Sequence, residues 1–313
     1  MTQPQELRIP VRDSELAVMC WPATQPQAPD APVVVALHGI TANALSWARV
    51  AHHLRGRVTL VAPEFRGRAG SADAPGPYGI PVHADDVAAL AEAMGLRRIV
   101  LAGHSMGAFV AALAAVRHPD LVSRLLLVDG GVGFPPPKAV DSDELITAVL
   151  GPAMARLSMT FPDRSAYRDF WQRHPALAGS WASWVDDYIQ RDLVGTEPDM
   201  HSSCRIDAVR TDGMGLFDAE VLEAVHRLPC PAALLWAERG LMDEPQGLYS
   251  EQRLDEARLD RDRIVTHRIL GMNHYTVLLG DQGARTVAGH LLEAAGGSGA
   301  GPRSTNGTES AAG

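Results

Sequence analysis

One serine in this chain is placed for nucleophilic chemistry, between two glycines in Gly103-His104-Ser105-Met106-Gly107. The segment follows an apolar run at 97–102 and opens an alanine-rich stretch at 108–116, so the pattern predicts a turn between a buried strand and a helix. In such a turn the backbone is strained, the serine hydroxyl is exposed above the sheet, and flanking glycines avoid steric collision. Because a serine hydroxyl is a weak nucleophile at neutral pH, Ser105 needs a neighbouring base.

The elements that must position this serine alternate between strands and helices. Continuous apolar runs predict strands covered on both faces, and an alternating pattern predicts an edge hairpin at 7–21. Alternation of this kind favours an α/β fold with a mostly parallel central sheet and helices on both faces. The expected strands are 32–37, 58–63, 97–102, 124–128, 231–236 and 263–270, and the expected helices are 44–54, 82–94, 108–116 and 283–295.

The composition changes after residue 133, where Phe134-Pro135-Pro136-Pro137 begins a segment rich in Trp, Met, Tyr and Phe. We therefore predict a core in two parts, residues 1–133 and 217–295, with a helical cap inserted at 134–216. Residues 296–313 are rich in Gly, Ser and Ala, and this composition predicts a disordered tail.

The Gly-x-Ser-x-Gly turn in this setting, with His38-Gly39 after an earlier strand, resembles the α/β-hydrolase family over roughly residues 7–295. The resemblance implies a base in a loop after the last strand. Among the 12 histidines, His274 in Gly271-Met272-Asn273-His274-Tyr275 has this position. His267 falls inside the expected strand and His290 in the last helix, while His38 and His104 are better explained as structural.

The sequence departs from the family pattern at the carboxylate that should orient this histidine. Relatives usually carry Gly-x-x-Asp where this chain has Ala237-Glu238-Arg239-Gly240, so glycine stands at the expected position of the acid. Asp129 is our first choice, since some relatives place the acid at the end of that earlier strand. Asp129 could instead cap a turn, and Asp243 and Glu238 remain alternatives.

The resemblance also implies an oxyanion hole formed by the backbone N–H groups of Ile40 and Met106, with Thr41 a weaker candidate for the first. Aromatic residues of the cap, including Trp171, could line an apolar pocket or pack the cap's own core. As substrate-binding residues we predict Trp181, Trp184 and Tyr188.

Arg66 and Arg68 could contact an acidic substrate, but they are better explained as structural ties beneath the site.

The serine nucleophile disfavours haloalkane dehalogenases and epoxide hydrolases, which use aspartate at this position. The His38–Asn43 loop matches neither proline iminopeptidases nor meta-cleavage-product hydrolases. We therefore expect a serine hydrolase that cleaves a carboxylic ester or lactone of a small to medium apolar substrate, with similarity to bacterial esterase-like hydrolases. An acyl thioesterase is the enzymatic alternative. A binding protein that lacks catalysis is the other, because of the glycine at position 240.

The composition of the chain argues against some classes of partner. A net charge of −9 over 313 residues argues against nucleic acid and anionic membranes as partners. The three cysteines suggest neither a disulfide framework nor a metal site, and we expect no cofactor. With no pattern of a signal peptide or membrane span, the cytoplasm is the expected location. The sequence leaves the oligomeric state open.

Overall fold

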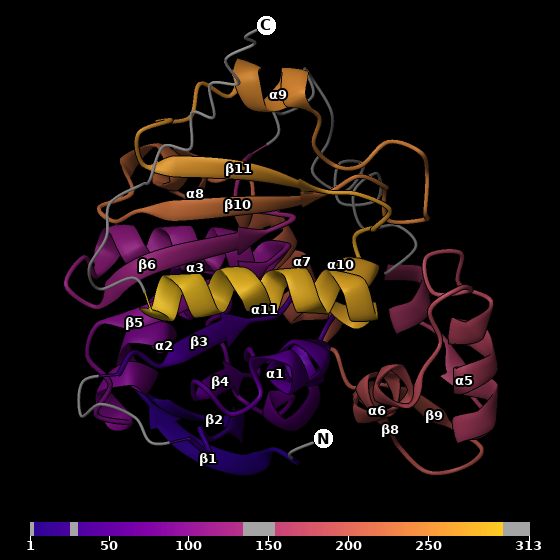
Figure 1. Cartoon of the computed structure of the whole chain (residues 1–313). Helices are drawn as coiled ribbons and strands as arrows, with labels where there is room; N and C mark the ends of the chain where they lie inside the picture. The colour runs from indigo at the N-terminus through magenta and orange to yellow at the C-terminus, as the bar shows by residue number, and fades with distance from the viewer. Residues whose placement is uncertain (1–2, 26–30, 134–153, 297–313) are drawn as a thin grey trace, which may run out of the picture.

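The computed structural model describes residues 3–25, 31–133 and 154–296. Its centre is an eight-stranded sheet within these residues, in the order β1-β2-β4-β3-β5-β6-β10-β11 (Figure 1). Strands from β4 to β11 in this order are parallel, and the β1–β2 hairpin adds to the edge in antiparallel fashion. The strands are β1 Gln5–Val11, β2 Ser14–Trp21, β3 Val34–Leu37, β4 Leu60–Pro63, β5 Ile99–His104, β6 Val122–Val128, β10 Ala232–Ala237 and β11 Ile264–Ile269.

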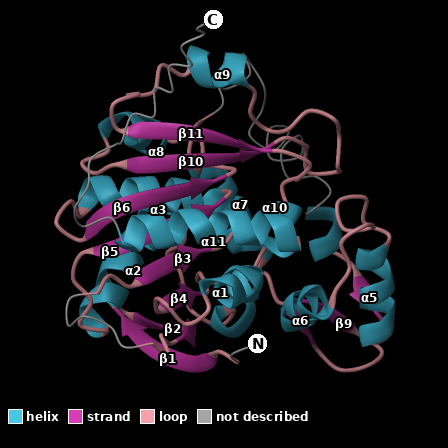
Figure 2. Cartoon of the chain, viewed as in Figure 1, coloured by secondary structure: helices cyan, strands magenta, loops and turns pink. Residues whose placement is uncertain are grey.

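Helices cover both faces of this sheet (Figure 2). One face carries α2 (Ile80–Ala93), α3 (Met106–Arg117) and α8 (Ala219–Ala224), with the short helix η3 (Val225–Arg227). The other face carries α1 (Ala48–Leu54), α10 (Thr276–Leu279) and α11 (Asp281–Gly296), with η1 (Ala44–Trp47). The central strands are buried on both sides, which explains their continuous apolar runs. The predicted α/β fold is therefore confirmed.

Three further helices are η2 (Ala69–Ser71), α7 (Ile206–Gly215) and α9 (Glu251–Glu256). None of the helices in the described residues is long and apolar enough to cross a membrane.

A separate layer of structure lies beyond the carboxyl ends of the parallel strands (Figure 1). It contains α5 (Arg164–Gln172), α6 (Ser183–Asp192) and a small antiparallel sheet of β7 (Thr160–Phe161), β9 (Met200–Ser202) and β8 (Leu193–Val194). The predicted helical cap thus also contains strands, which sequence patterns miss because two or three residues cannot establish an alternating or continuous apolar run.

This layer has its own hydrophobic cluster, which includes Phe161, Tyr167, Val185 and Met200. By contrast, Val209 of α7 belongs to the cluster around α3, so the last part of the predicted cap range packs with the core. The first part of that range, 134–153, and nearly all of the predicted tail, 297–313, lie outside the described residues.

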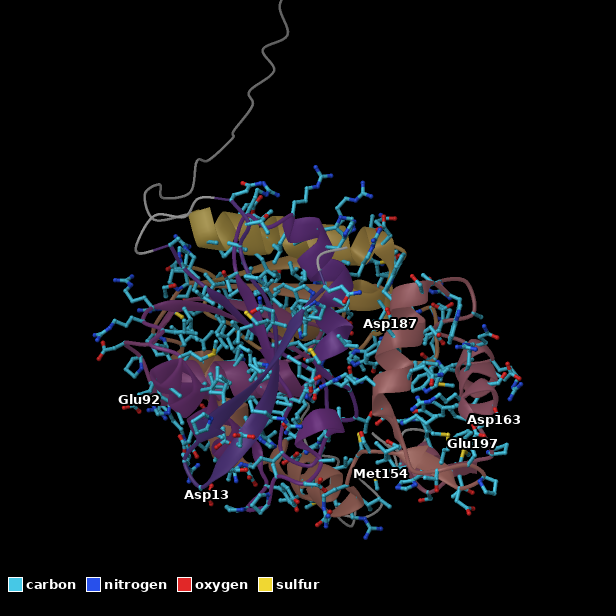
Figure 3. The ribbon with its side chains drawn as sticks, turned by 90° about the horizontal axis from the view of Figure 1, so that it is seen from below. Asp13, Glu92, Met154, Asp163, Asp187 and Glu197 are labelled. Atoms are coloured by element: carbon cyan, nitrogen blue, oxygen red, sulfur yellow. The ribbon has the colours of Figure 1, made fainter. Side chains whose placement is uncertain are left out.

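Acidic side chains project from both the core and the cap, in keeping with the negative net charge. Figure 3 shows Glu92 of the core, with Asp187 and Glu197 of the cap, and all three are exposed.

Candidate active site

Ser105 lies in the sharp turn between β5 and α3, with φ +54° and ψ −122°. Both flanking glycines are required by close backbone packing. A Cβ atom at Gly103 would lie 2.1 Å from the carbonyl oxygen of Gly107, and one at Gly107 would lie 2.5 Å from that of Leu37. The strained serine, at the N-terminal end of α3, is therefore held in place by neighbours that leave no room for side chains.

His274 follows β11 and donates from its ring to Asp129, with 2.6 Å between Nδ1 and Oδ2. Asp129 follows β6 at φ +45° and is fully buried. Its other oxygen, Oδ1, accepts the backbone N–H of Ala237 at 3.0 Å. Because the carboxylate accepts at Nδ1–H, the other ring nitrogen, Nε2, is free to take a proton.

The two alternative carboxylates bond elsewhere. Asp243 accepts from Arg239 at 2.7 Å and from Asn273 at 3.0 Å. Glu238 accepts from Arg268 at 2.6 Å and from a backbone N–H at 2.7 Å. Within the described residues, Asp129 is therefore the carboxylate that the structure brings to His274.

Asn273, which sequence reasoning did not single out, holds the histidine loop. Its Oδ1 accepts the backbone N–H groups of Tyr275 and Thr276, at 3.0 and 2.8 Å. Its Nδ2 donates to the carbonyl of Ala176 in the cap at 3.0 Å. An Asn followed by residues that can turn back onto its side chain is a recognisable turn signal in Asn273-His274-Tyr275-Thr276.

His104 and His38 have the structural roles expected of them. The Nε2 of His104 lies 2.9 Å from the carbonyl oxygen of His274, and burial holds the pKa of His104 well below its usual value. The ring is therefore neutral and donates to that carbonyl. His38 contacts the carbonyl of Gly39 at 2.7 Å and accepts the N–H of Phe65 at 3.0 Å, while burial lowers its pKa to about 3.

Two carbonyl groups of the loop after β3 are contacted by arginine side chains. Arg68 donates to the carbonyl of Ile40 at 3.0 Å, and Arg156 of the cap lies 3.4 Å from that of Thr41. In the described part of the chain, no protein group accepts the N–H of Ile40 or of Met106. Two backbone donors therefore remain available beside the serine.

Arg66 and Arg68 are fully buried and paired with carboxylates. Arg66 binds Asp86 at 2.6 Å, and Arg68 binds Asp212 of α7 at 2.5 Å. Neither lines the cavity described next, so both are placed as the structural ties that the sequence suggested.

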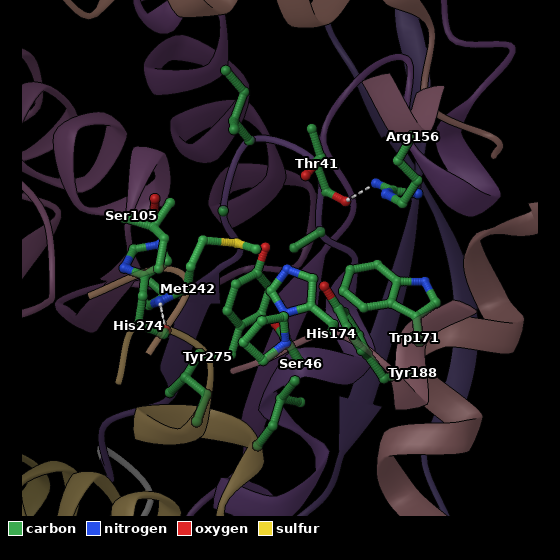
Figure 4. Close-up of a pocket in the computed structure, with 18 of the residues that line it drawn as sticks. Thr41, Ser46, Ser105, Arg156, Trp171, His174, Tyr188, Met242, His274 and Tyr275 are labelled. Carbon is green, nitrogen blue, oxygen red and sulfur yellow. Dashed lines mark hydrogen bonds between the residues drawn. The ribbon is translucent and has the colours of Figure 1, made fainter. Parts of the chain in front are cut away.

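A cavity of about 570 Å³ lies between core and cap, and both Ser105 and His274 open into it (Figure 4). Of the predicted substrate-binding residues, Tyr188 lines the cavity and Trp181 and Trp184 do not. Trp184 donates from its indole nitrogen to the carbonyl of Leu279 at 2.7 Å, so its side chain packs between cap and core. Trp171 is among the other aromatic residues that line the cavity together with Tyr188.

The described residues contain no group of three or more His, Cys, Asp or Glu side chains suited to hold a metal ion.

Comparison with known proteins shows which protein family this architecture belongs to. A family model described as alpha/beta hydrolase fold matches residues 32–260. The N-formylmaleamate deformylase of Pseudomonas putida is 28% identical over 71% of this chain and 76% of its own. The lipase LipV of Mycobacterium tuberculosis is 36% identical over 32% of this chain and 38% of its own.

Other matches cover less of the relative or show the fold alone. The first curated relatives, uncharacterized mycobacterial proteins, are 35% identical, and this chain spans 29% of their length. The crystal structure of E-2-(acetamidomethylene)succinate hydrolase superposes with a TM-score of 0.73 at 20% identity, over 93% of this chain and 100% of that one. By its family match and its architecture, the chain belongs to the α/β-hydrolase fold family.

Proposed function

We propose that the protein is a serine hydrolase that cleaves a carboxylic ester or lactone through an acyl-enzyme. The observation that carries this proposal is the 2.6 Å contact between His274 Nδ1 and Asp129 Oδ2, in a cavity that also contains Ser105. An imidazole oriented by a buried carboxylate is the arrangement that activates a serine hydroxyl.

The proposed reaction uses each residue at a stated atom. His274 Nε2 takes the hydroxyl proton while Ser105 Oγ attacks the carbonyl carbon, and the N–H groups of Ile40 and Met106 hold the oxygen that becomes negative. The ester C–O bond then breaks, and His274 gives its proton to the leaving alcohol. Water, deprotonated by the same nitrogen, releases the acid, so that ester and water yield acid and alcohol.

Much of the cavity wall is apolar, with Leu241, Met242, Leu278 and Leu279 among its residues. This supports a substrate of small to medium size with an apolar acyl part. The argument for a binding protein without catalysis rested on the glycine at position 240, and it weakens because Asp129 supplies a carboxylate to His274.

Amide hydrolysis is a second candidate, favoured by the similarity to N-formylmaleamate deformylase over 71% of the chain. The same acyl-enzyme would form, and His274 would protonate a leaving nitrogen instead of an oxygen.

The test is turnover of p-nitrophenyl esters from acetate to octanoate, and of the matching anilides, by the parent and by Ser105→Ala. We expect Ser105→Ala to lose at least about 10³-fold in kcat, because the nucleophile is removed. Ser183→Ala, at an exposed site on α6, is the matched control and should keep the parent rate. A fluorophosphonate probe should label Ser105 in the parent. Rates in Ser105→Ala close to those of the parent would refute the assignment.

A further inference from the structure

The cavity contains a second group of polar side chains, away from the serine. Its wall carries the hydroxyl groups of Ser46, Tyr188 and Tyr275, and the ring of His174 also lies on this wall. In Figure 4 Ser105 and His274 lie on one side, and His174, Tyr188 and Arg156 on the other. We call Ser46, Arg156, His174, Tyr188 and Tyr275 the donor cluster.

The hydroxyls of the donor cluster lack protein partners in the described residues. The Oγ of Ser46 has no hydrogen bond although the residue is 4% exposed. Tyr188 is 5% exposed, and neither its phenol nor that of Tyr275 bonds to another described group. Buried polar groups are normally satisfied, so the unpartnered Oγ of Ser46, with two further phenols on the same cavity wall that bond to no described group, points to a ligand that completes them.

The backbone holds these hydroxyls in place. Asn43 donates from its side chain to the carbonyl of Tyr188 at 2.9 Å, and its side chain also accepts the N–H of Leu45, in the turn that carries Ser46. On the other side, the contact from Asn273 to Ala176 ties the His174 segment to the loop of Tyr275. The cluster is therefore built where cap and core are joined, and its groups need little rearrangement to bind.

At neutral pH each of these groups presents a hydrogen. Burial raises the pKa of Tyr188 and of Tyr275, so both phenols stay protonated. His174 Nδ1 accepts the backbone N–H of Ala176 at 3.3 Å, which leaves the hydrogen on Nε2. Burial also lowers the pKa of His174, so its ring is neutral.

Two arginines line the cavity beside the hydroxyls, and the charge of one of them, Arg156, is balanced by the buried carboxylate of Asp192. Arg156 lines the cavity, and its guanidinium is fixed by Asp192 at 2.5 Å and by the phenol oxygen of Tyr167 at 2.8 Å. Arg173 also lines the cavity and makes no ion pair within the described residues. The carboxylate on the wall, Glu244, lies with Leu241 and Met242 and accepts the N–H of Met242 at 2.8 Å.

We propose that the donor cluster binds a carboxylate at the far end of the substrate's acyl chain. A carboxylate offers two oxygens with several acceptor sites, and its burial is tolerated where charged and neutral donors surround it. If the protein is the hydrolase proposed above, its substrates are half-esters of short dicarboxylic acids, or the corresponding half-amides. The apolar wall then contacts the methylene chain between the two ends.

The test separates binding from turnover. Binding of monomethyl glutarate and of methyl pentanoate, which has an apolar chain end in place of the carboxylate, is measured by calorimetry on Ser105→Ala. We expect monomethyl glutarate to bind at least about ten-fold more tightly, the value of one hydrogen bond to a charged group. Adding Tyr188→Phe should remove most of that preference. Tyr78→Phe removes a phenol outside the cavity and is the matched control.

Equal affinity for the two ligands, or a preference that survives Tyr188→Phe, would overturn the subsite. The same comparison for turnover uses p-nitrophenyl hydrogen glutarate and p-nitrophenyl pentanoate with the parent. Hydrolysis of both without preference, with equal binding, would reject the subsite and keep the hydrolase. A binding preference that depends on Tyr188, with no turnover of any ester or amide, would keep the subsite and reject the hydrolase.

Discussion

Replacing Asp129 by asparagine tests the reasoning about the active site most directly. Asp129 Oδ1 accepts the N–H of Ala237 at 3.0 Å, so the oxygen of asparagine is expected to keep that place. The amide NH₂ then faces His274 Nδ1, where the carboxylate lay at 2.6 Å. Two donors cannot bond, so the ring must shift its hydrogen to Nε2, the nitrogen that has to take the serine proton.

The expected loss follows from this change of tautomer. An aspartate-to-asparagine change of this type lowers kcat by about 10⁴ in a serine protease triad, which corresponds to about 5.4 kcal/mol of activation free energy. The assay is turnover of p-nitrophenyl butyrate by Asp129→Asn, together with thermal unfolding to establish that the variant is folded. The fluorophosphonate probe should also label Ser105 more slowly.

Asp243→Asn is the matched control, because this carboxylate follows β10 but bonds to Arg239 and Asn273. We expect its kcat to stay within about ten-fold of the parent, as its contacts reach the histidine loop only indirectly. The reasoning is refuted if Asp129→Asn keeps more than a tenth of the parent rate, or if Asp243→Asn loses as much as Asp129→Asn.

Two further predictions concern stability. Asp192→Asn should lower the free energy of unfolding by about 3–5 kcal/mol, since it leaves the buried guanidinium of Arg156 without its charge partner. The comparison variant is Glu220→Gln, which breaks a surface ion pair. Urea unfolding should show a much smaller loss of unfolding free energy for Glu220→Gln, and equal losses for the two variants would contradict the prediction. The second prediction concerns pH. His38 and His104 have folded pKa values below their usual 6.5, so their contribution to the free energy of unfolding is complete above pH 6.5 and is lost as the pH falls below it. Each histidine can lower the free energy of unfolding by up to about 1.4 kcal/mol per pH unit. An unfolding free energy from urea titrations that stays constant from pH 7.5 to 5 would refute this prediction.

The sequence predicted the sheet well because its central strands are buried on both faces and most of the parallel strands are separated by helices. β5 begins as a continuous apolar run and β6 ends as one, and the glycines around Ser105 marked the turn between β5 and α3. The positions of Ser105 and His274 within the fold followed from the same pattern. Their roles in catalysis remain predictions.

The sequence left three carboxylates open as partners of His274, because the choice depends on a local backbone angle and a neighbouring strand. Asp129 reaches His274 from a residue at φ +45°, and the N–H that orients it comes from Ala237, 108 residues later in the chain. Neither contact leaves a pattern in the residues around position 129.

The cavity wall was also beyond the sequence. Whether a tryptophan of the cap faces the cavity or the core depends on its partner in space, and Trp184 bonds to Leu279, 95 residues away. The donor cluster joins side chains from η1, α6, the segment before β7 that carries Arg156, and the loops that carry His174 and Tyr275, so no local motif contains it.

The position of Asp129 has a consequence for protein engineering. Since the carboxylate that bonds to His274 follows β6, the loop that follows β10 carries no part of the proposed triad. That loop nevertheless supplies Leu241, Met242 and Glu244 to the cavity wall. We expect that it can be randomised as a library to change which substrates enter, with Arg239 and Asp243 kept to preserve its anchor, while the contact between Asp129 and His274 is left unchanged.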